Sequence, residues 1–270
     1  MNKIIEYYGG FDEWGRLDRE PVEFLVNWHY IRKYLPERGH VLDNGAGPGK
    51  YAIELAKQGF DVTLTDLTPR LVRLAKEKAE ECGVSERFKG FHCVNAVQLD
   101  SLTDQQFDAS LMLGPLYHLQ TEPERVSALR ELYRVTKKNG YVFVAFMTKI
   151  RHLTTSLTYP EFWKPNETLG GIQAFMQTGT FNHADEGRFT GVYYFDIEEI
   201  KPFMESGGFE TVELIGSSSI AGSFRQEQFD YWRSRGEEEF EGVMNIIYRE
   251  AGNPYNLAAS SHLLYIGKRI

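Results

Sequence analysis

A chain of 270 residues with 42% hydrophobic and 25% charged residues has the composition of a globular protein that buries a sizeable core. Its formal net charge of -8 is opposite in sign to the basic surface of nucleic-acid-binding proteins, so we expect no nucleic-acid partner. The longest apolar run, residues 141–147, is far shorter than a membrane span. We therefore expect no membrane association and a cytoplasmic location.

Short apolar runs separated by helical patterns predict a parallel sheet with crossover helices. The strands are expected at residues 40–43, 60–66, 91–94, 107–113, 141–147, 209–216 and 261–268. A first long helix is expected at 18–35, and further helices between the first five strands. Thr121 with Glu124 forms a capping-box pattern for one of them, which Asn139-Gly140 would stop.

The regular alternation ends after the fifth strand. Residues 148–195 are too long for a simple connection and rich in aromatic residues, which favours an inserted cap over the site. Residues 217–260 predict a helical insertion before the last strand, with a break near Gly236. We expect one domain over residues 1–270, with 1–36 as an N-terminal lid and helix region.

The sharpest motif is a glycine-rich turn between the first expected strand and the helix that follows it, with glycines at Gly45, Gly47 and Gly49. Glycine permits sharp turns and a close approach of the backbone to a ligand. The helix N-terminus behind the turn offers amide groups to an anionic group such as an amino-acid carboxylate. Asp66 ends the next strand, where an acid meets a ribose hydroxyl in nucleotide-binding sheets. Together these residues predict an adenosine-containing ligand.

The same turn departs from two other nucleotide-binding motifs. Lys50 stands where the dinucleotide fingerprint G-x-G-x-x-G has its third glycine, which disfavours NAD and FAD. No G-K-[ST] follows the turn, so a phosphate-binding P-loop is absent as well.

Taken together, the motifs resemble those of class I S-adenosylmethionine (AdoMet)-dependent methyltransferases of the small-molecule type. Residues 42–49 resemble their first motif, and Asp66 matches their ribose-binding acid. Residues 111–119 resemble the segment after their fourth strand, and residues 130–140 the helix and turn before their fifth. The resemblance implies a Rossmann-like α/β fold with helices on both faces of a seven-stranded, mostly parallel sheet. The implied strand order is 3-2-1-4-5-7-6 with strand 7 antiparallel.

The resemblance also implies AdoMet as cofactor, S-adenosylhomocysteine as product, and a set of contacting residues. From the methionine part to the ribose and the adenine, these residues are Asp43, Gly45, Ala46, Gly47, Leu113, Asp66, Leu67, Asn95 and Ala96. Asn95 stands where the family commonly has an acid. Its side-chain oxygen can accept a hydrogen bond from an adenine amino group.

Tyr117 and His118 follow the fourth strand, where the loops of this fold face the transferred methyl group. We expect both side chains to line that site. His118 is a candidate acid or base because its pKa is ordinarily near neutral, and a packed structural role is the alternative.

The segment before the first long helix is rich in aromatic residues and glycine. Tyr7, Tyr8, Trp14 and Arg16 would form a lid over AdoMet and substrate, with Arg16 pairing with a carboxylate. An amphipathic packing segment is the alternative.

The sequence therefore predicts AdoMet-dependent methyl transfer to a small organic acceptor. Displacement at a sulfonium methyl group needs alignment of the acceptor and exclusion of water. The sequence shows no clustered ligand spacing, so we expect no metal. A nucleotide (NAD)-dependent oxidoreductase and a non-catalytic AdoMet-binding module are the alternatives. The acceptor atom and the oligomeric state are left open.

Overall fold

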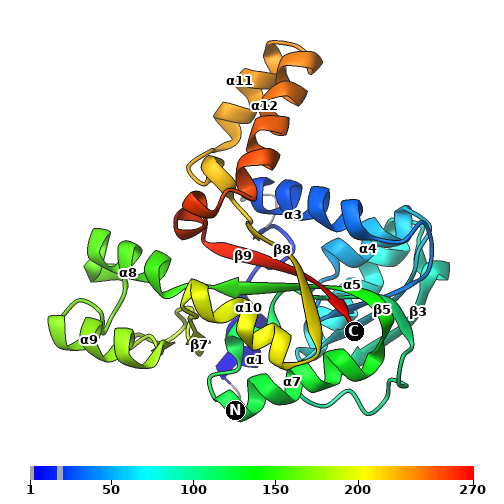
Figure 1. Ribbon diagram of the computed structural model, residues 1–270, viewed down its shortest axis with the longest axis horizontal. Helices are drawn as coiled ribbons and strands as arrows, with labels where there is room; N and C mark the ends of the chain where they lie inside the picture. The colour runs from blue at the N-terminus through cyan, green and yellow to red at the C-terminus, as the bar shows by residue number, and fades with distance from the viewer. Residues whose placement is uncertain (1–2, 17–20) are drawn as a thin grey trace.

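A seven-stranded sheet forms the centre of the molecule in a computed structural model that describes residues 3–16 and 21–270 (Figure 1). Its strands are β1 (His40–Asn44), β2 (Asp61–Asp66), β3 (Phe88–Cys93), β4 (Phe107–Met112), β5 (Thr136–Met147), β8 (Phe209–Gly216) and β9 (His262–Arg269). They lie in the order β3-β2-β1-β4-β5-β9-β8, with β9 antiparallel to both of its neighbours.

The predicted order of the strands in the central sheet is confirmed when the two strands of a separate small hairpin are not counted. Strands β6 (Thr180–Phe181) and β7 (Val192–Tyr193) pair only with each other, in a separate two-stranded sheet. The sixth and seventh strands of the central sheet are therefore β8 and β9, and the α/β fold class is confirmed.

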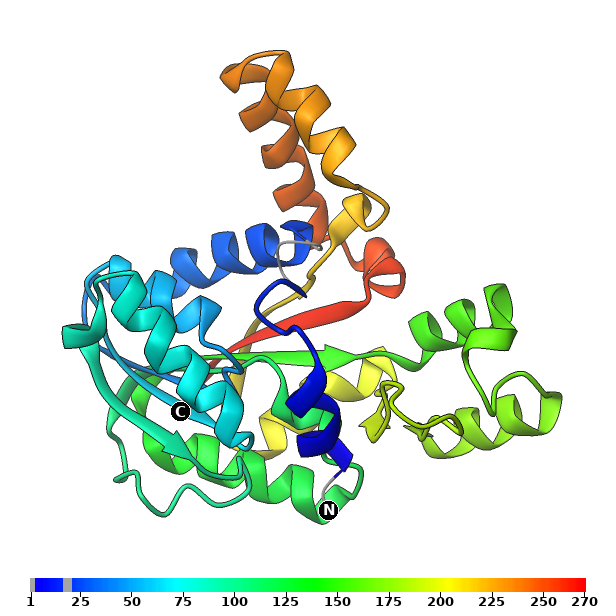
Figure 2. The same ribbon diagram turned by 180° about the vertical axis from the view of Figure 1, so that it is seen from behind.

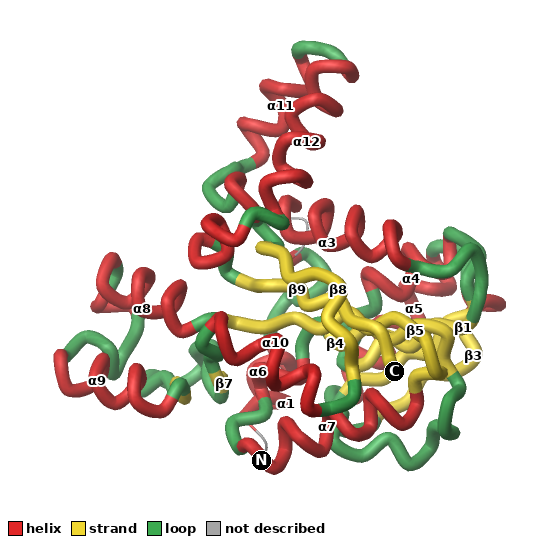
Figure 3. Tube along the Cα trace, in the orientation of Figure 1, coloured by secondary structure: helices red, strands yellow, loops and turns green. Residues whose placement is uncertain are grey.

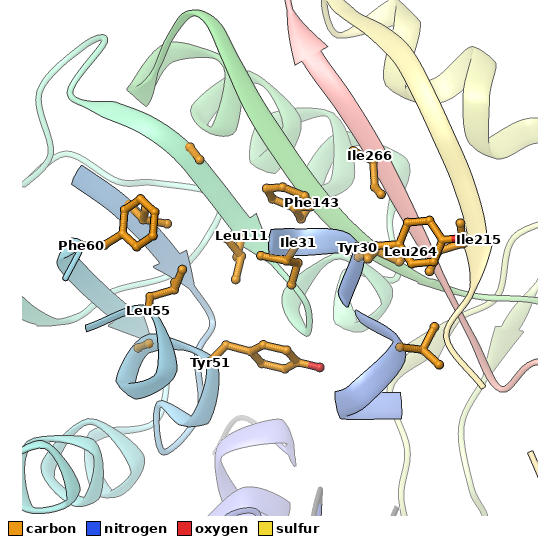
Figure 4. Packing of buried hydrophobic residues seen from close by; sticks show 14 of the residues in the cluster. Tyr30, Ile31, Tyr51, Leu55, Phe60, Leu111, Phe143, Ile215, Leu264 and Ile266 are labelled. Carbon is orange, nitrogen blue, oxygen red and sulfur yellow. The ribbon is translucent and has the colours of Figure 1, made fainter. Parts of the chain in front are cut away.

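Helices cover both faces of the sheet. One face carries α3 (Pro21–Tyr34), α4 (Lys50–Lys57) and α5 (Pro69–Glu81), and the C-terminal half of α12 (Glu237–Ala251) joins the same apolar cluster. The other face carries α7 (Glu122–Val135) and α10 (Ile197–Ser206). Figure 4 shows the first face, where Ile31 of α3 lies beside Leu111 and Phe143 of the sheet. Leu55 of α4 lies in the same apolar cluster, on the side of Phe60. Burying such large apolar side chains contributes roughly 1.5–3 kcal/mol each, so these helices are held firmly on the sheet.

The predicted end of the helix at Asn139-Gly140 is wrong. Helix α7 ends at Val135 and β5 begins at Thr136, which pairs with Phe107 of β4. The register of β4 and β5 shifts within this stretch, where Asn139 has a φ of 66°. Asn139-Gly140 therefore marks an irregularity inside a strand, which uses the same turn-forming residues as a helix stop.

The helix expected between the third and fourth strands is also wrong, since residues 94–106 contain turns and no helix. Tertiary contacts fix this connection in place of helical hydrogen bonds. The guanidinium of Arg134 donates to the carbonyls of Leu99 and Leu102 at 3.0 and 2.9 Å. Both leucines are buried against Phe107 and Val135.

Two helical arms extend away from the sheet (Figures 1 and 3). Residues 148–195 contain α8 (Lys149–Thr158), α9 (Leu169–Thr178) and the β6–β7 hairpin, and residues 217–260 contain α11 (Gln226–Ser234) and α12. The roles predicted for these segments and for residues 1–36 stay predictions, and residues 18–20 of the first predicted helix lie outside the described residues. No helix in the described part of the chain is both long and apolar enough to cross a membrane.

Candidate functional site

A pocket lies at the carboxyl ends of β1, β2 and β4, where the turns of parallel strands meet at one edge of the sheet. The N-terminal segment, with helix α1 (Lys3–Gly10), lies in front of the strands in Figure 2 and supplies part of the lining. The predicted site residues in the lining are Tyr8, Arg16, Asp43, Gly45, Ala46, Gly47, Asp66, Leu67, Asn95, Ala96, Leu113, Tyr117 and His118. Two predicted residues, Tyr7 and Trp14, are not among the lining residues.

The pocket has two walls. The glycine-turn wall consists of Asp43, Gly45, Ala46, Gly47, Asp66, Leu67, Asn95 and Ala96. The tyrosine wall consists of Tyr8, Arg16, Tyr117 and His118, the last two from helix α6 (Pro115–His118) after β4.

The glycine turn requires glycine for conformation and for space. Gly45 and Gly47 have φ angles of 71° and 56°, a region that residues with a side chain rarely adopt. A Cβ atom on Gly45 would lie 2.0 Å from Cγ of Pro115. The amides of Gly45 and Ala46 both donate to the carbonyl of Thr65, at 2.8 and 3.0 Å, so backbone bonds to β2 hold the turn.

Asp66 links the turn to the end of β2. Its Oδ2 accepts from the amide of Gly47 and its Oδ1 from the amide of Thr68, both at 2.8 Å. Burial raises the pKa of Asp66, although the Thr68 and Gly47 amides oppose that rise. Each carboxylate oxygen retains a lone pair for a further donor, which fits a pair of ribose hydroxyls.

Asp43 is 2% exposed, and its Oδ2 has no hydrogen-bond partner among the described residues. Burial raises the pKa of Asp43 to about 7; the backbone N–H of Ala52 opposes the rise and Asp66 adds to it. A buried carboxylate with an unpaired oxygen is costly unless a donor reaches it. The ammonium group of an amino-acid ligand fits that requirement.

Leu67, Asn95 and Ala96 line the far end of the same wall. Asn95 is exposed, and its Oδ1 accepts from the amide of Val97 at 3.2 Å. This bond uses one of the two lone pairs of the oxygen, so Oδ1 can still accept a hydrogen bond and the side-chain NH₂ can donate one.

On the tyrosine wall, the hydroxyl of Tyr8 lies 3.0 Å from Nε2 of His118, and Nδ1 of His118 lies 3.4 Å from the carbonyl of Gly191. A carbonyl only accepts, so Nδ1 carries the proton and Nε2 accepts from Tyr8. Burial lowers the pKa of His118 to about 4, with the Gly191 carbonyl opposing. His118 is therefore a neutral imidazole whose two nitrogens are both occupied.

Arg16 of the tyrosine wall belongs to a network of partly buried charges. Nε of Arg16 donates to Glu13 at 2.8 Å, and its terminal nitrogens lie 3.3–3.4 Å from the carboxylate of Glu23 on α3. Nδ1 of His262, the first residue of β9, lies 3.2 Å from Oε2 of Glu23, at ion-pair distance but outside good hydrogen-bond geometry. Burial alone would lower the pKa of Arg16, but Glu23 and Glu13 hold it well above its usual range.

Sequence reasoning missed Glu23 and His262. One is a single acid on a helix and the other a single histidine at the start of a strand, so neither belongs to a motif. Only the packing of α3 over the end of β9 brings them together. No local pattern in the sequence could have identified this pair.

The two predicted residues outside the lining pack against neighbouring side chains. The Trp14 ring lies beneath the ammonium groups of Lys50 and Lys78, at 5.6 and 5.3 Å. The Tyr7 ring stacks on Phe11 at 5.2 Å and meets Phe189 edge-on. These contacts hold the segment across the pocket, consistent with packing as well as with a lid.

Comparisons with known proteins agree with this arrangement. A family model described as a methyltransferase domain matches residues 41–140. A Geobacillus protein whose name assigns it to the methyltransferases is 30% identical over 208 residues, which cover 68% of this chain and 81% of that protein.

Other relatives differ in the molecule that they methylate. The tRNA 5-carboxymethoxyuridine methyltransferase of Escherichia coli is 32% identical over 125 residues, or 45% of this chain and 46% of that enzyme, so the match spans about half of its length. Among solved structures, the 1,6-didemethyltoxoflavin-N1-methyltransferase of Burkholderia thailandensis, with S-adenosylhomocysteine bound, has a TM-score of 0.55 at 16% identity. The match covers 98% of this chain and 84% of the Burkholderia chain, and it shows a similarity of fold.

Proposed function

Because this chain belongs to the class I AdoMet-dependent methyltransferases, we propose that it transfers the methyl group of AdoMet to a small organic acceptor by in-line displacement. AdoMet supplies a methyl group on a positively charged sulfur, which is already a good leaving group. The protein must then align the acceptor and exclude water. The observation that carries the proposal is the pocket, with a glycine-turn wall that fits AdoMet and an aromatic wall beside it.

In this proposal the glycine-turn wall binds AdoMet. The unpaired oxygen of Asp43 accepts from the ammonium group, and Asp66 accepts from the ribose hydroxyls. Leu67, Asn95 and Ala96 contact the adenine. The turn is held by backbone bonds before the cofactor arrives, so little conformational entropy is lost on binding.

The lining favours a small acceptor over a polyanion. Its ionisable side chains other than histidine and tyrosine are the carboxyl groups of Glu13, Asp43, Asp66 and Glu124 and the cations Arg16 and Lys50. A nucleic acid would bring phosphates toward this acidic lining, on a chain of net charge -8. The N-terminal segment also lies across the turn, where Cγ of Glu13 would be 3.4 Å from a Cβ atom on Gly47. A nucleotide within tRNA would have to displace that segment.

The cofactor part of the proposal is tested by replacing the ribose-binding acid. Asp66→Ala should weaken the binding of AdoMet and S-adenosylhomocysteine by about 1.5–3 kcal/mol, or roughly 10- to 150-fold, because hydrogen bonds to a charged acceptor are lost. Isothermal calorimetry measures this. Asp61→Ala, at the other end of the same strand, removes an equal charge and should leave both affinities unchanged.

The acceptor part is tested by turnover. The protein is incubated with AdoMet and separate pools of phenols, amines, thiols and transfer RNA, and S-adenosylhomocysteine is quantified. We expect turnover with a small-molecule pool. Turnover with tRNA alone would overturn the small-acceptor proposal and leave the methyltransferase intact. Absence of AdoMet binding by the unmodified protein would overturn the cofactor assignment itself. The cytoplasmic location stays a prediction.

A further inference from the structure

The hydroxyl of Tyr8 has a fixed direction. Its oxygen lies 3.0 Å from Nε2 of His118, and Nδ1 of that ring lies 3.4 Å from the carbonyl of Gly191. Because the carbonyl can only accept, the proton of the neutral imidazole lies on Nδ1, and Tyr8 donates its own proton to Nε2. Both side chains belong to residues that line the pocket. Tyr8 therefore has no proton left for a bound molecule and offers it only the lone pairs of its oxygen.

Tyr117 repeats this arrangement beside the glycine turn. Its hydroxyl donates to the carbonyl of Leu113 at 3.3 Å, so this oxygen also has only lone pairs to offer. A Cβ atom on Gly114 would lie 3.9 Å from this hydroxyl and 3.3 Å from the carbonyl of Gly45, which places the phenol where the two walls meet. Burial and then Tyr117 raise the pKa of Tyr8 well above its usual range, and burial raises the pKa of Tyr117, so both neighbours stay neutral phenols.

Arg16 is the cation of the tyrosine wall, and carboxylates of the protein already face it. Its Nε donates to Glu13 at 2.8 Å, and its terminal nitrogens lie 3.3–3.4 Å from the carboxylate of Glu23. A carboxylate on the acceptor would have to compete with these two groups for the guanidinium, and it would also meet the lone pairs of Tyr8 and Tyr117. An acceptor that carries hydrogen-bond donors fits this wall, and an anionic acceptor does not.

The hydrogens on the reacting atom narrow the acceptor class further. A primary amine has two N–H groups for two phenol oxygens and keeps a lone pair for the methyl group. A hydroxyl or thiol has a single hydrogen, which must leave as the new bond forms, and that step needs a base. His118 cannot be this base, because both of its ring nitrogens are engaged. A neutral amine keeps its hydrogens during the transfer, so it needs no base from the tyrosine wall.

We propose that the acceptor is a primary amine, selected by the phenol oxygens of Tyr8 and Tyr117, an inference that rests on the proposed function. The N–H groups of the neutral amine donate to the two oxygens, and its lone pair forms the bond to the methyl carbon. The carbon–sulfur bond breaks with its electron pair on sulfur. The nitrogen then carries the positive charge and both hydrogens, and it loses one proton to water after the product leaves. Tyr8 and Tyr117 determine specificity and transfer no proton.

The first test is a turnover screen with matched acceptors. Primary amines, alcohols or phenols, and thiols of the same carbon skeleton, such as benzylamine, benzyl alcohol and benzyl mercaptan, are incubated separately with the protein and AdoMet. S-adenosylhomocysteine is then quantified. Primary amines should be turned over, and the corresponding alcohols, phenols and thiols should react at least tenfold more slowly. Turnover of phenols or thiols in place of amines would overturn the inference.

The second test compares the best primary amine with its N-methyl derivative, which has one N–H group fewer. Tyr8→Phe and Tyr117→Phe should each lower kcat/KM for the primary amine about 3- to 10-fold, the effect of one hydrogen bond, and lower kcat/KM for the N-methyl amine less. The Kd for S-adenosylhomocysteine should stay within threefold, which shows that each variant is folded. Tyr7→Phe, at a tyrosine outside the pocket lining, is the matched control and should retain full activity.

These outcomes separate the inference from the proposed function. Absence of AdoMet binding, or of turnover with every class of acceptor, contradicts the proposed function, and the inference falls with it. If amines are turned over but the two variants lower kcat/KM equally for the primary and the N-methyl amine, or leave both unchanged, only the selection by Tyr8 and Tyr117 is contradicted. In that case the two hydroxyls serve only to hold α1 and α6 in place.

Discussion

The two walls of the pocket are built in opposite ways. Every residue of the glycine-turn wall lies within a few residues of the carboxyl end of β1, β2 or β3, and backbone bonds such as those to Thr65 hold it. The tyrosine wall and the network behind it join α1, α3, α6 and β9 through side-chain contacts. Its Tyr8 and His118 are 110 positions apart in the chain.

This contrast separates two tasks. A backbone turn presents a fixed shape that depends little on which side chains surround it, and it suits a cofactor that is always the same. A wall made of side chains from distant elements can change by single substitutions, and it suits an acceptor that differs among relatives. We therefore expect the two walls to respond differently to mutation.

The largest effect of a substitution is expected at Gly45 of the glycine-turn wall, which has no space for a side chain. Gly45→Ala combines a left-handed backbone with a Cβ atom that would overlap Pro115, so it should destabilise the protein by about 3 kcal/mol or more and weaken AdoMet binding over 100-fold. Urea denaturation and calorimetry measure both. Gly83→Ala has a similar φ of 68° with no atom within 4 Å and should cost only about 1 kcal/mol, with binding unchanged. Equal losses of stability and of AdoMet affinity in Gly45→Ala and Gly83→Ala would show that the contact with Pro115 does not fix the turn.

A second prediction concerns Asp43, the buried acid of the glycine-turn wall. Because burial raises the pKa of Asp43 from 3.8 to about 7, the folded protein holds this proton more tightly than the unfolded chain does. Stability contributed by Asp43 is therefore present below pH 4 and lost as the pH rises toward 7. Asp43→Asn should raise the free energy of unfolding by about 1–3 kcal/mol at pH 8 and change it little at pH 4.

The same variant should bind AdoMet more weakly, by about 1.5–3 kcal/mol, since the ammonium group loses a charged partner. Urea denaturation at the two pH values and calorimetry at pH 8 test the two statements. Tighter AdoMet binding by Asp43→Asn would contradict the assignment of Asp43 to the cofactor.

The smallest effect is expected on the tyrosine wall. Tyr8→Phe removes the donor to Nε2 of His118 and should cost about 1 kcal/mol of stability, because a buried acceptor is left without a partner. We expect the KM of the acceptor to rise several-fold while the Kd of AdoMet changes less than threefold. Tyr7→Phe, whose hydroxyl forms no hydrogen bond with the described residues, is the control. If Tyr8→Phe raised the Kd of AdoMet more than the KM of the acceptor, the two walls would not be independent.

The parts of the fold that were predictable are those set by local patterns. Alternating apolar runs placed all seven strands of the sheet, and the capping box of Thr121 and Glu124 forms as expected. The errors arose where a long-range contact competes with a local signal. Arg134 and buried leucines replace a helix before β4, and pairing with β4 extends β5 through Asn139-Gly140.

The sequence by itself determined the glycine-turn wall, because the carboxyl ends of parallel strands meet at one edge and any motif placed there joins one site. It also identified Tyr117 and His118 by their position after β4. Only the tertiary structure decided how those two residues are used. It occupies both nitrogens of His118 and brings Glu23 beside His262, a meeting that depends on how α3 packs over the end of β9. Such contacts leave no periodicity or spacing in the chain, since each is made by one side chain on an otherwise ordinary element.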